Sequence, residues 1–412
     1  MPVNHEKGHT VEIHGVTKAQ GRWTRTRGLR MSLFFAALFL GLGVFVPFFP
    51  VWLSAQGLDA TQISVVLACQ MAVRIFAGPA FAFLADVLHN RRALLIALSL
   101  AALAGMVLLA LVTGFLAILC LAVAASVMWT PILPLMESLA VAESEGGGPD
   151  YGRTRLWGSL SFILGSVGGG YILRYTSPDT VIWILVAAYT ALAVSAFALP
   201  KDTGVRASSE RYTVTKARFA DVLPVVFHPV FLAVLCSVSL IQASHAFYYG
   251  FGTIHWQTVG IGDDVIGALW AVGVVAEVVL FAFARRTLSL VGPLGLILAG
   301  AAAALIRWCM TALEPDIGWL VVIQLGHALT FGATHLGAMH FIARAAPTRY
   351  HATVQGIHAA FAGGIVMALV MSGSGGLYAS YGAFGYLAMA ALGAVGGILA
   401  LGAAFRWDGG KL

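Results

Sequence analysis

The chain has 412 residues, of which 59% are hydrophobic and only 10% are charged. A soluble domain carries about 25% charged residues, so the composition excludes an ordinary soluble protein and predicts a membrane protein with many spans in a lipid bilayer. The formal net charge of +6 does not indicate a nucleic-acid partner, because nearly all of the 24 Lys and Arg fall between apolar segments.

The chain begins with a polar, basic segment, residues 1–30, without the apolar region of a signal peptide, and we expect a cytoplasmic tail there. Apolar segments long enough to cross a bilayer, which takes about 20 residues, follow it to the end. Twelve such segments are predicted, at 31–54, 61–85, 93–113, 115–141, 155–174, 180–199, 229–251, 265–284, 292–313, 318–342, 352–371 and 380–403.

The basic residues predict the orientation of these spans. All but three of the 24 Lys and Arg lie in the tails and in every second loop. The opposite loops hold only Arg174, and the other two, Arg74 and Arg307, lie inside spans. Because positive charge accumulates on the cytoplasmic side, we expect both termini to be cytoplasmic.

The longest connection is polar and follows the sixth span, which divides the chain into two halves as in transporters built from parallel repeats. We therefore predict an all-α polytopic membrane protein of twelve transmembrane helices in two six-helix bundles. The expected units are a tail at 1–30, a bundle at 31–200, a cytoplasmic linker at 201–228, a bundle at 229–405 and a tail at 406–412.

Charged residues inside the spans are the strongest functional signal. Arg74, Glu137, Glu277 and Arg307 lie well inside apolar segments, and Arg155 begins one. A charge at the bilayer centre costs about 2.5–3.5 kcal/mol, and intramembrane charges usually face a cavity and mark function. The alternative interpretation is a set of static ion pairs that hold helices together.

Helical periodicity places further polar and aromatic side chains on shared faces, at about 100° per residue. Such faces avoid lipid and predict a polar, aromatic-lined cavity, although interhelical hydrogen bonds worth about 0.6 kcal/mol each are the simpler alternative. The faces comprise Arg155, Ser159, Phe162 and Ser166; Gln242, His245 and Tyr249; Trp270 and Glu277; His327, Phe331 and His335. Phe45 and Phe49 either belong to an interfacial aromatic belt or line the site.

Motifs of soluble enzymes do not occur in the sequence. There is no GxxxxGK[ST], HExxH or GxSxG, and no Cys/His spacing typical of a metal site. We therefore expect neither an enzyme nor a cofactor or metal, and any work must come from gradients.

The segment after the second span, GPAFAFLADVLHNRR, resembles the signature of the major facilitator superfamily of secondary transporters. It differs from that signature because its second Gly is missing and its basic pair is displaced by a residue. The resemblance implies that Asp86, Arg91 and Arg92 act in gating at the cytoplasmic face.

Within the superfamily, stretches over nearly the whole chain are similar to the phenylpropionate permease group, distant relatives of the lactose/proton symporters. Examples are GVFVPFFPVWLSAQGLDATQIS at 43–64 and HALTFGATHLGAMHFI at 327–342. The likeness to lactose permease implies that Glu137 and Arg155 bind substrate and that Arg307 and His327 serve proton coupling. The span-10 carboxylate of that permease has no counterpart here.

These observations lead to the hypothesis of proton-coupled import of a small organic solute, such as an aromatic carboxylate, through the inner cell membrane by a monomer. We expect Glu277 to carry the proton, with Arg307 and His327 tuning it and Glu137 as second choice. Arg155 or Arg74 would bind an anionic substrate group. A sugar or nucleoside symporter and a drug/proton antiporter remain the alternatives, and a membrane sensor or enzyme is a more distant one.

Overall fold

Helices form every regular element in the part of the chain that the computed structural model describes, residues 13–200 and 222–412. The helices before the gap, called the N-half below, are α1 (Ile13–Ala55), α2 (Ala60–Leu88), α3 (Arg91–Leu109), α4 (Phe115–Trp129), α5 (Ile132–Glu145), α6 (Tyr151–Leu173) and α7 (Thr180–Ala198). Most of the predicted linker lies outside the described residues.

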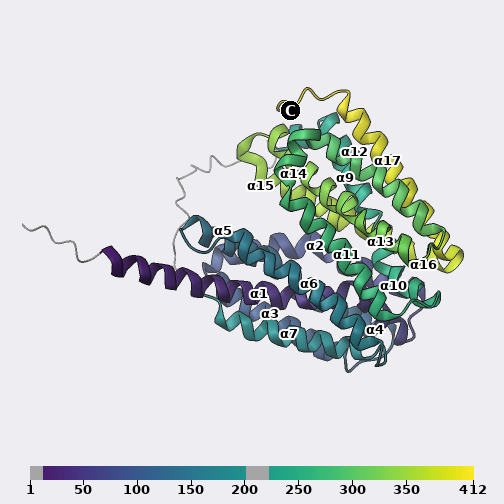
Figure 1. The fold of residues 1–412 in the computed structure, drawn as a ribbon, viewed down its shortest axis with the longest axis horizontal. Helices are drawn as coiled ribbons and strands as arrows, with labels where there is room; N and C mark the ends of the chain where they lie inside the picture. Colours follow the sequence, from purple (N-terminus) through teal and green to yellow (C-terminus); the bar gives the residue numbers. More distant parts are fainter. Residues whose placement is uncertain (1–12, 201–221) are drawn as a thin grey trace, which may run out of the picture.

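The helices after the gap are called the C-half. They are α8 (Leu223–Val226), α9 (Pro229–Ala243), α10 (Ala246–Thr258), α11 (Asp263–Ala282), α12 (Ala284–Ala312), α13 (Ile317–Leu325), η2 (Ala328–Ala333), α14 (Thr334–Ala345), η3 (Thr348–Tyr350), α15 (His351–His358), η4 (Ala359–Val366), α16 (Met367–Tyr381), η5 (Gly382–Gly385) and α17 (Tyr386–Ala404). Figure 1 shows the two halves side by side, with the helices of each running along the same general direction.

Eleven helical stretches among the described residues are long and apolar enough to cross a membrane. Ten of them coincide with the first ten predicted spans, and the eleventh, 353–404, contains the last two. Within it, Gly382 has a φ of +54° and opens the short helix η5 between α16 and α17. Because a positive φ favours glycine and breaks a helix, the chain turns there, and the number of twelve spans stays a prediction.

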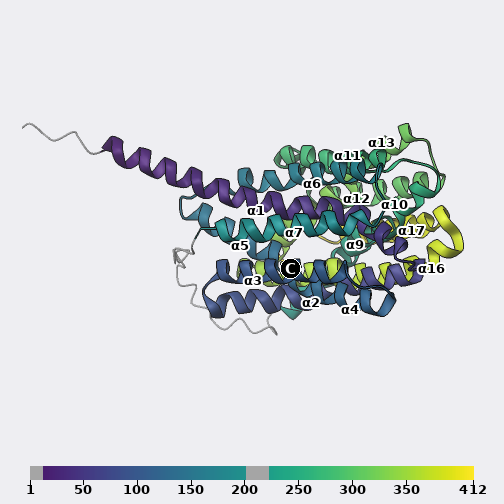
Figure 2. The same cartoon turned by 90° about the horizontal axis from the view of Figure 1, so that it is seen from below.

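The first helix begins earlier than the hydropathy predicts. α1 starts at Ile13, whereas the predicted span starts at residue 31, so much of the expected N-terminal tail is helical. Figures 1 and 2 show this part of α1 projecting beyond the other helices. Hydropathy locates the part of a helix that lies in lipid, but it does not report where a helix continues into water.

Several spans are interrupted near their centres. The chain breaks between α4 and α5 at Pro131, and between α9 and α10 at Ser244 and His245. Two spans contain π-helical segments, η2 and η4. Such irregular backbone in a membrane helix is tolerated where other helices surround it, and π-segments often occur at functional sites.

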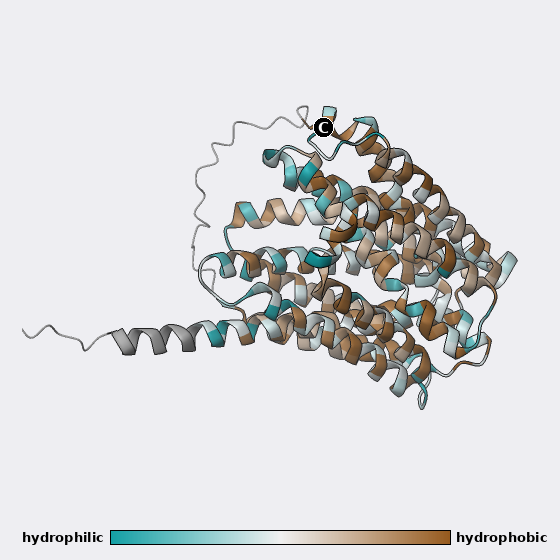
Figure 3. Ribbon diagram, turned by 45° about the horizontal axis from the view of Figure 1, so that its top comes forward, coloured by the Kyte–Doolittle hydropathy of each residue, from teal (hydrophilic) through white to brown (hydrophobic). Residues whose placement is uncertain are grey.

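The outer surface of the bundle is apolar. Large hydrophobic side chains such as Phe76, Leu111, Leu116 and Ile398 are exposed, and Figure 3 shows that hydrophobic residues predominate along the helices of both halves. A surface of this kind is suited to lipid rather than water.

Two helix crossings join the halves. α6 packs along α11, and α2 packs along α16, with smaller contacts of α2 with η4 and of α1 with α10. Both crossings are close: a Cβ on Gly267 would collide with the carbonyl oxygen of Ser166, and one on Gly375 with that of Ala60. Small residues at helix interfaces let backbones approach in this way.

Candidate functional site

A buried arginine organises the polar cluster of the C-half. Arg307, on α12, is only 3% exposed. Its Nη2 donates to Gln324 Oε1 at 2.8 Å, and its Nη1 donates to Thr330 Oγ1 at 3.2 Å. The guanidinium also lies 4.4 Å from the ring centroid of Trp308, a cation–π contact. Arg307 is therefore committed to partners of the protein itself.

A carboxylate and an imidazole extend this cluster toward the N-half. His327 Nδ1 lies 3.4 Å from Arg307 Nη1, and His327 Nε2 lies 3.7 Å from Glu277 Oε2. The Glu277 side chain is 21% exposed and the His327 side chain 12%. The three residues that the sequence proposes for proton coupling are thus neighbours, although their roles remain predictions.

The bonds around His245 form a directed chain. Its Nδ1 lies 3.0 Å from the Gln242 carbonyl oxygen, so Nδ1 must donate, and the Nε2 of a neutral ring then accepts from Thr330 Oγ1 at 2.9 Å. Arg307 donates to the same hydroxyl. His245 is fully buried, so it supports the site from behind and has no open face for a solute.

Three rings stack along one face of span ten. His327 and Phe331 are 5.5 Å apart and nearly parallel, and Phe331 and His335 are 6.4 Å apart and nearly parallel. His335 is exposed. The face predicted from helical periodicity is therefore present, and it leads from the buried cluster to a surface that a solute can reach.

Glu137 and Arg155 form an ion pair between consecutive spans. Arg155 Nε lies 3.3 Å from Glu137 Oε1, with side chains 27% and 36% exposed. The Arg155 guanidinium also lies 4.1 Å from the centroid of Phe39. Arg155 in addition lies within electrostatic reach of Glu277 in the other half. The predicted neighbourhood of Glu137 and Arg155 is confirmed.

Arg74 differs from the other two arginines of the spans. It lies on α2, is exposed, and has no hydrogen bond or ion pair among the described residues. Tyr249 on α10, across the boundary between the halves, lies within electrostatic reach of it. Arg74 is thus a cation at the inner surface with no anion beside it.

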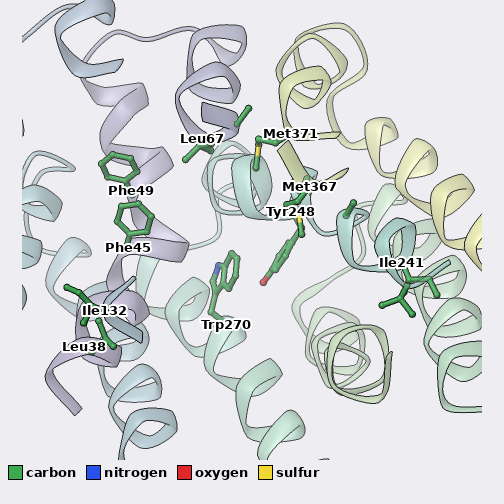
Figure 4. Packing of buried hydrophobic residues seen from close by; sticks show 14 of the residues in the cluster. Leu38, Phe45, Phe49, Leu67, Ile132, Ile241, Tyr248, Trp270, Met367 and Met371 are labelled. Atoms are coloured by element: carbon green, nitrogen blue, oxygen red, sulfur yellow. The ribbon is translucent and has the colours of Figure 1, made fainter. Parts of the chain in front are cut away.

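Aromatic rings gather around Tyr249, the ring within electrostatic reach of Arg74. Trp270 stacks on Tyr248 at 4.2 Å and on Tyr249 at 6.1 Å. Figure 4 shows Trp270 and Tyr248 next to each other, with Phe45 and Phe49 on α1. The two phenylalanines stack at 4.5 Å and are buried, as is Trp270, whereas Tyr249 is partly exposed. Tyr249 is therefore the ring best placed to face Arg74.

The remaining predicted residues are less engaged. Ser159 and Phe162, on α6, are partly buried. Gln242 is buried, and its Nε2 has no hydrogen-bond partner among the described residues. Of the predicted gating residues, Arg92 donates to the Phe197 carbonyl oxygen at 2.8 Å.

The other two gating residues, Asp86 and Arg91, are not joined by an ion pair in the described part of the chain, and Asp86 is exposed. The structure therefore places the signature loop at the surface of the N-half, and among the described residues these side chains make no hydrogen bond or ion pair with the C-half. Their gating role stays a prediction.

An ion pair that the sequence reasoning did not propose joins the halves. Arg174, after α6, pairs with Asp264 in the first turn of α11. Hydrogen bonding to the Asp264 carboxylate holds the pKa of Arg174 above its ordinary value. A signal existed, because Arg174 is the one basic residue in the loops of its side. The end of the bundle with this pair is called the Arg174 end below.

The contacts of Arg307 were also incompletely predicted. Gln324 Nε2 donates to the Tyr248 hydroxyl at 2.7 Å and to the Leu269 carbonyl oxygen at 3.0 Å. Gln324 thereby ties α13 to α10 and α11. Its place on the His327 face is visible in the sequence, but its partners come from distant segments.

A bundle of apolar, membrane-crossing helices, with polar groups from both halves at an inner surface, is the architecture of a membrane transporter. The chain belongs to the MFS_1 like family, whose model matches residues 28–388. The resemblance to the major facilitator superfamily is thereby confirmed.

Relatives and solved structures agree with this assignment. The chain is 28% identical over 375 residues to the "Probable 3-phenylpropionic acid transporter" of Escherichia coli (strain K12), covering 89% of this chain and 95% of that protein. It is 26% identical over 339 residues to the "Maltose permease" of Geobacillus stearothermophilus, covering 81% and 83%.

In fold, the chain is similar to the solved nucleoside transporter NupG, with a TM-score of 0.77 at 15% identity, covering 92% of this chain and 99% of that one. All three similar proteins are transporters. The chain is accordingly a transporter of the major facilitator type and not an enzyme.

Proposed function

We propose that this transporter imports a small aromatic carboxylate together with protons, by alternating access to a site between its two halves. The observation that carries the proposal is the state of Arg74. It is exposed and has no ion pair among the described residues, whereas Arg307 is bound to Gln324 and Thr330. An anionic substrate requires a cation that it can reach and whose N–H donors are not already bonded. Arg74 meets this requirement, whereas Arg307 is buried and hydrogen-bonded to neutral groups.

The aromatic residues near Arg74 would recognise the ring of the substrate. Trp270 and Tyr249 lie close to each other and on the C-half side of Arg74. An aromatic ring of a substrate can pack against the partly exposed ring of Tyr249, which Trp270 supports from behind, while its carboxylate pairs with the guanidinium. The name of the relative in Escherichia coli, a 3-phenylpropionic acid transporter, supports this class of substrate.

Glu277 supports proton coupling. It is the carboxylate between the Arg307 cluster and the inner surface, with His327 on one side and Arg155 within electrostatic reach. Burial favours the neutral form of a carboxylate and a nearby cation favours the ionised form. A movement that changes the distance between Glu277 and Arg155 would therefore load or release a proton.

The contacts between the halves support alternating access. Among the described residues, the close crossings lie toward the Arg174 end, where Gly170 faces Asp263 and Gly375 faces Ala60. α14 and α15 have no extensive contact with the N-half in the described part of the chain. We assign this arrangement to a state closed at the Arg174 end, which is the predicted extracellular side.

Uptake into proteoliposomes tests the proposal. Purified protein should accumulate radiolabelled 3-phenylpropionate under an imposed pH gradient, acidic on the side of entry, and a protonophore should abolish the accumulation. Uptake that ignores the gradient would refute proton coupling. Proton efflux against substrate entry would instead indicate a drug/proton antiporter.

A sugar or nucleoside symporter is the second candidate. It is favoured by Glu137, whose carboxylate side chain is 36% exposed beside Arg155 and can accept hydrogen bonds from hydroxyl groups. The relative named maltose permease and the fold shared with a nucleoside transporter are compatible with it. A competition assay distinguishes the two candidates. If the transporter carries sugars or nucleosides, excess unlabelled maltose or uridine would block uptake of its labelled substrate, and excess 3-phenylpropionate would not.

A further inference from the structure

An open, surface-facing cavity of about 670 Å³ lies on the C-half at the Arg174 end. It is separate from the cluster around Arg307, because none of that cluster's residues lines it. Its walls come from the ends of α10, α12 and α16 and from η5, and they include His255, Glu314, Tyr378, Tyr381 and Phe384. Its size is that of a small-molecule site, about 300–1,000 Å³.

One carboxylate dominates the charge of this cavity. Glu314 Oε1 lies 3.1 Å from His255 Nε2, and the Glu314 side chain is 52% exposed while that of His255 is 9% exposed. No Lys or Arg lines the cavity. Glu314 has no second partner among the described residues, so part of its carboxylate faces the open space.

The backbone at Glu314 is unusual. Its φ is +51°, and only one other non-glycine residue in the described chain, His89, has a positive φ. Glycine or asparagine adopts this conformation with less strain. Glu314 follows the C-cap of α12, where a left-handed residue commonly ends a helix, and from this turn it lines the cavity.

Aromatic rings form the rest of the recognition surface. Tyr378, Tyr381 and Phe384 line the cavity. Tyr378 makes an edge contact with the ring of His255 at 6.1 Å, while Tyr381 is 64% exposed and Phe384 61%. A carboxylate beside exposed aromatic faces is the combination that binds organic ammonium groups, through charge pairing and cation–π contacts.

We propose that this cavity binds an organic ammonium group, with Glu314 as its counter-ion and Tyr378, Tyr381 and Phe384 as its walls. The ammonium can belong to a free amine or to the headgroup of an ethanolamine phospholipid, because the cavity opens where the spans end and interfacial aromatics meet headgroups. This site does not depend on the transport substrate proposed above.

Binding to the purified full-length protein tests the free-amine source. Phenethylamine should bind saturably, measured by isothermal titration, and 2-phenylethanol, which has the same ring without the charge, should not. Glu314→Gln should weaken phenethylamine binding at least tenfold. Glu145→Gln, at an exposed carboxylate at the end of α5, should leave it unchanged.

Native mass spectrometry tests the lipid source. Phosphatidylethanolamine should remain bound in preference to phosphatidylglycerol with the same acyl chains, and Glu314→Gln should remove the preference. Tyr381→Leu, which keeps apolar bulk but removes the ring, should weaken the binding of phosphatidylethanolamine, and Tyr381→Phe, which keeps the ring, should bind it as the wild type does.

Three results would overturn the proposal. The first is equal binding of phenethylamine by the wild type and Glu314→Gln. The second is equal retention of both lipids together with no binding of phenethylamine. The third is that neither phenethylamine nor phosphatidylethanolamine binds saturably. The last result, combined with lower thermal stability of Glu314→Gln, would reduce the His255–Glu314 pair to a structural link between α10 and the end of α12.

Discussion

His327 holds its Nε2 atom 3.7 Å from the Glu277 carboxylate. The other ring nitrogen lies 3.4 Å from Arg307 Nη1. A guanidinium can only donate, so Nδ1 of His327 must accept and the proton of the neutral ring sits on Nε2, facing Glu277. A second proton on this ring would meet the charge of Arg307, which makes Glu277 the better place for a transported proton.

We predict that Glu277→Gln uncouples transport from protons. Glutamine is close in size to protonated glutamate but cannot release a proton, so accumulation driven by a pH gradient should fall at least tenfold. Exchange of internal for external substrate needs no proton release and should persist. Both are measured in proteoliposomes with the same labelled substrate.

The control for this variant is Glu145→Gln, which removes an exposed carboxylate far from the cluster and should transport normally. Glu137→Gln distinguishes the two intramembrane carboxylates: it should raise the KM and keep coupling. If Glu277→Gln keeps transport fully coupled to protons and Glu137→Gln loses this coupling, then Glu137 and not Glu277 carries the proton.

A change at Arg74 should affect substrate charge recognition. Hydrogen bonds to charged groups contribute about 1.5–3 kcal/mol, so Arg74→Gln should raise the KM for 3-phenylpropionate about 10- to 150-fold. Arg74→Lys should restore part of the affinity because it keeps the charge but not the planar fork. Binding of the neutral amide of the substrate should change little, and an equal loss for acid and amide would contradict the role.

Hydropathy and charge were sufficient for the outline of the fold. The spans carry few charges and long apolar runs, so most of their limits follow from the sequence to within a few residues, as for Thr180–Ala198. The starts of α1 and α12 and the end of α10 do not, because these helices continue beyond their most apolar part. The neighbourhood of Glu137 and Arg155 was also predictable, because they lie on consecutive antiparallel spans. Ser166 lies on the predicted Arg155 face and donates to the Gly267 carbonyl oxygen at 3.1 Å.

The sequence could not predict which charged side chains are bonded to other protein groups and which are free. Whether Arg307 is free depends on Gln324, whose contacts with Arg307 and Tyr248 join segments far apart in the chain. His245 shares a helix face with Tyr249, yet it is fully buried and bonded to Thr330. Periodicity identifies a face that avoids lipid, but it cannot distinguish a helix contact from a cavity wall.

The hydrogen bonds of Arg307 predict a cost for removing one of its partners. Gln324→Leu leaves a buried guanidinium nitrogen and the Tyr248 hydroxyl without their bonds. An unsatisfied buried group costs about 1–3 kcal/mol, so the apparent melting temperature in detergent should fall by several degrees. Gln257→Leu is a control at a partly buried glutamine bonded to Asp263, where a smaller loss is expected. A Gln324→Leu protein as stable as the wild type would show that Arg307 finds other partners.

The crossing of α6 and α11 predicts a way to shift the conformational equilibrium. A Cβ on Gly267 would collide with the Ser166 carbonyl oxygen, and backbone atoms cannot move aside cheaply. Gly267→Val should therefore prevent closure at the Arg174 end and favour a state open there, with transport lost. Spin labels at the exposed residues Ser177 and Val259, in a background without the four native cysteines, should report a longer and broader distance.

The matched control is Gly168→Val on α6, where an added Cβ meets open space and the distance should stay at its wild-type value. Both variants gain the same side chain in a membrane helix, so a difference between them isolates the contact with Ser166. An unchanged distance in Gly267→Val would mean that the crossing yields locally, and that closure at the Arg174 end depends on other contacts, such as α2 with α16.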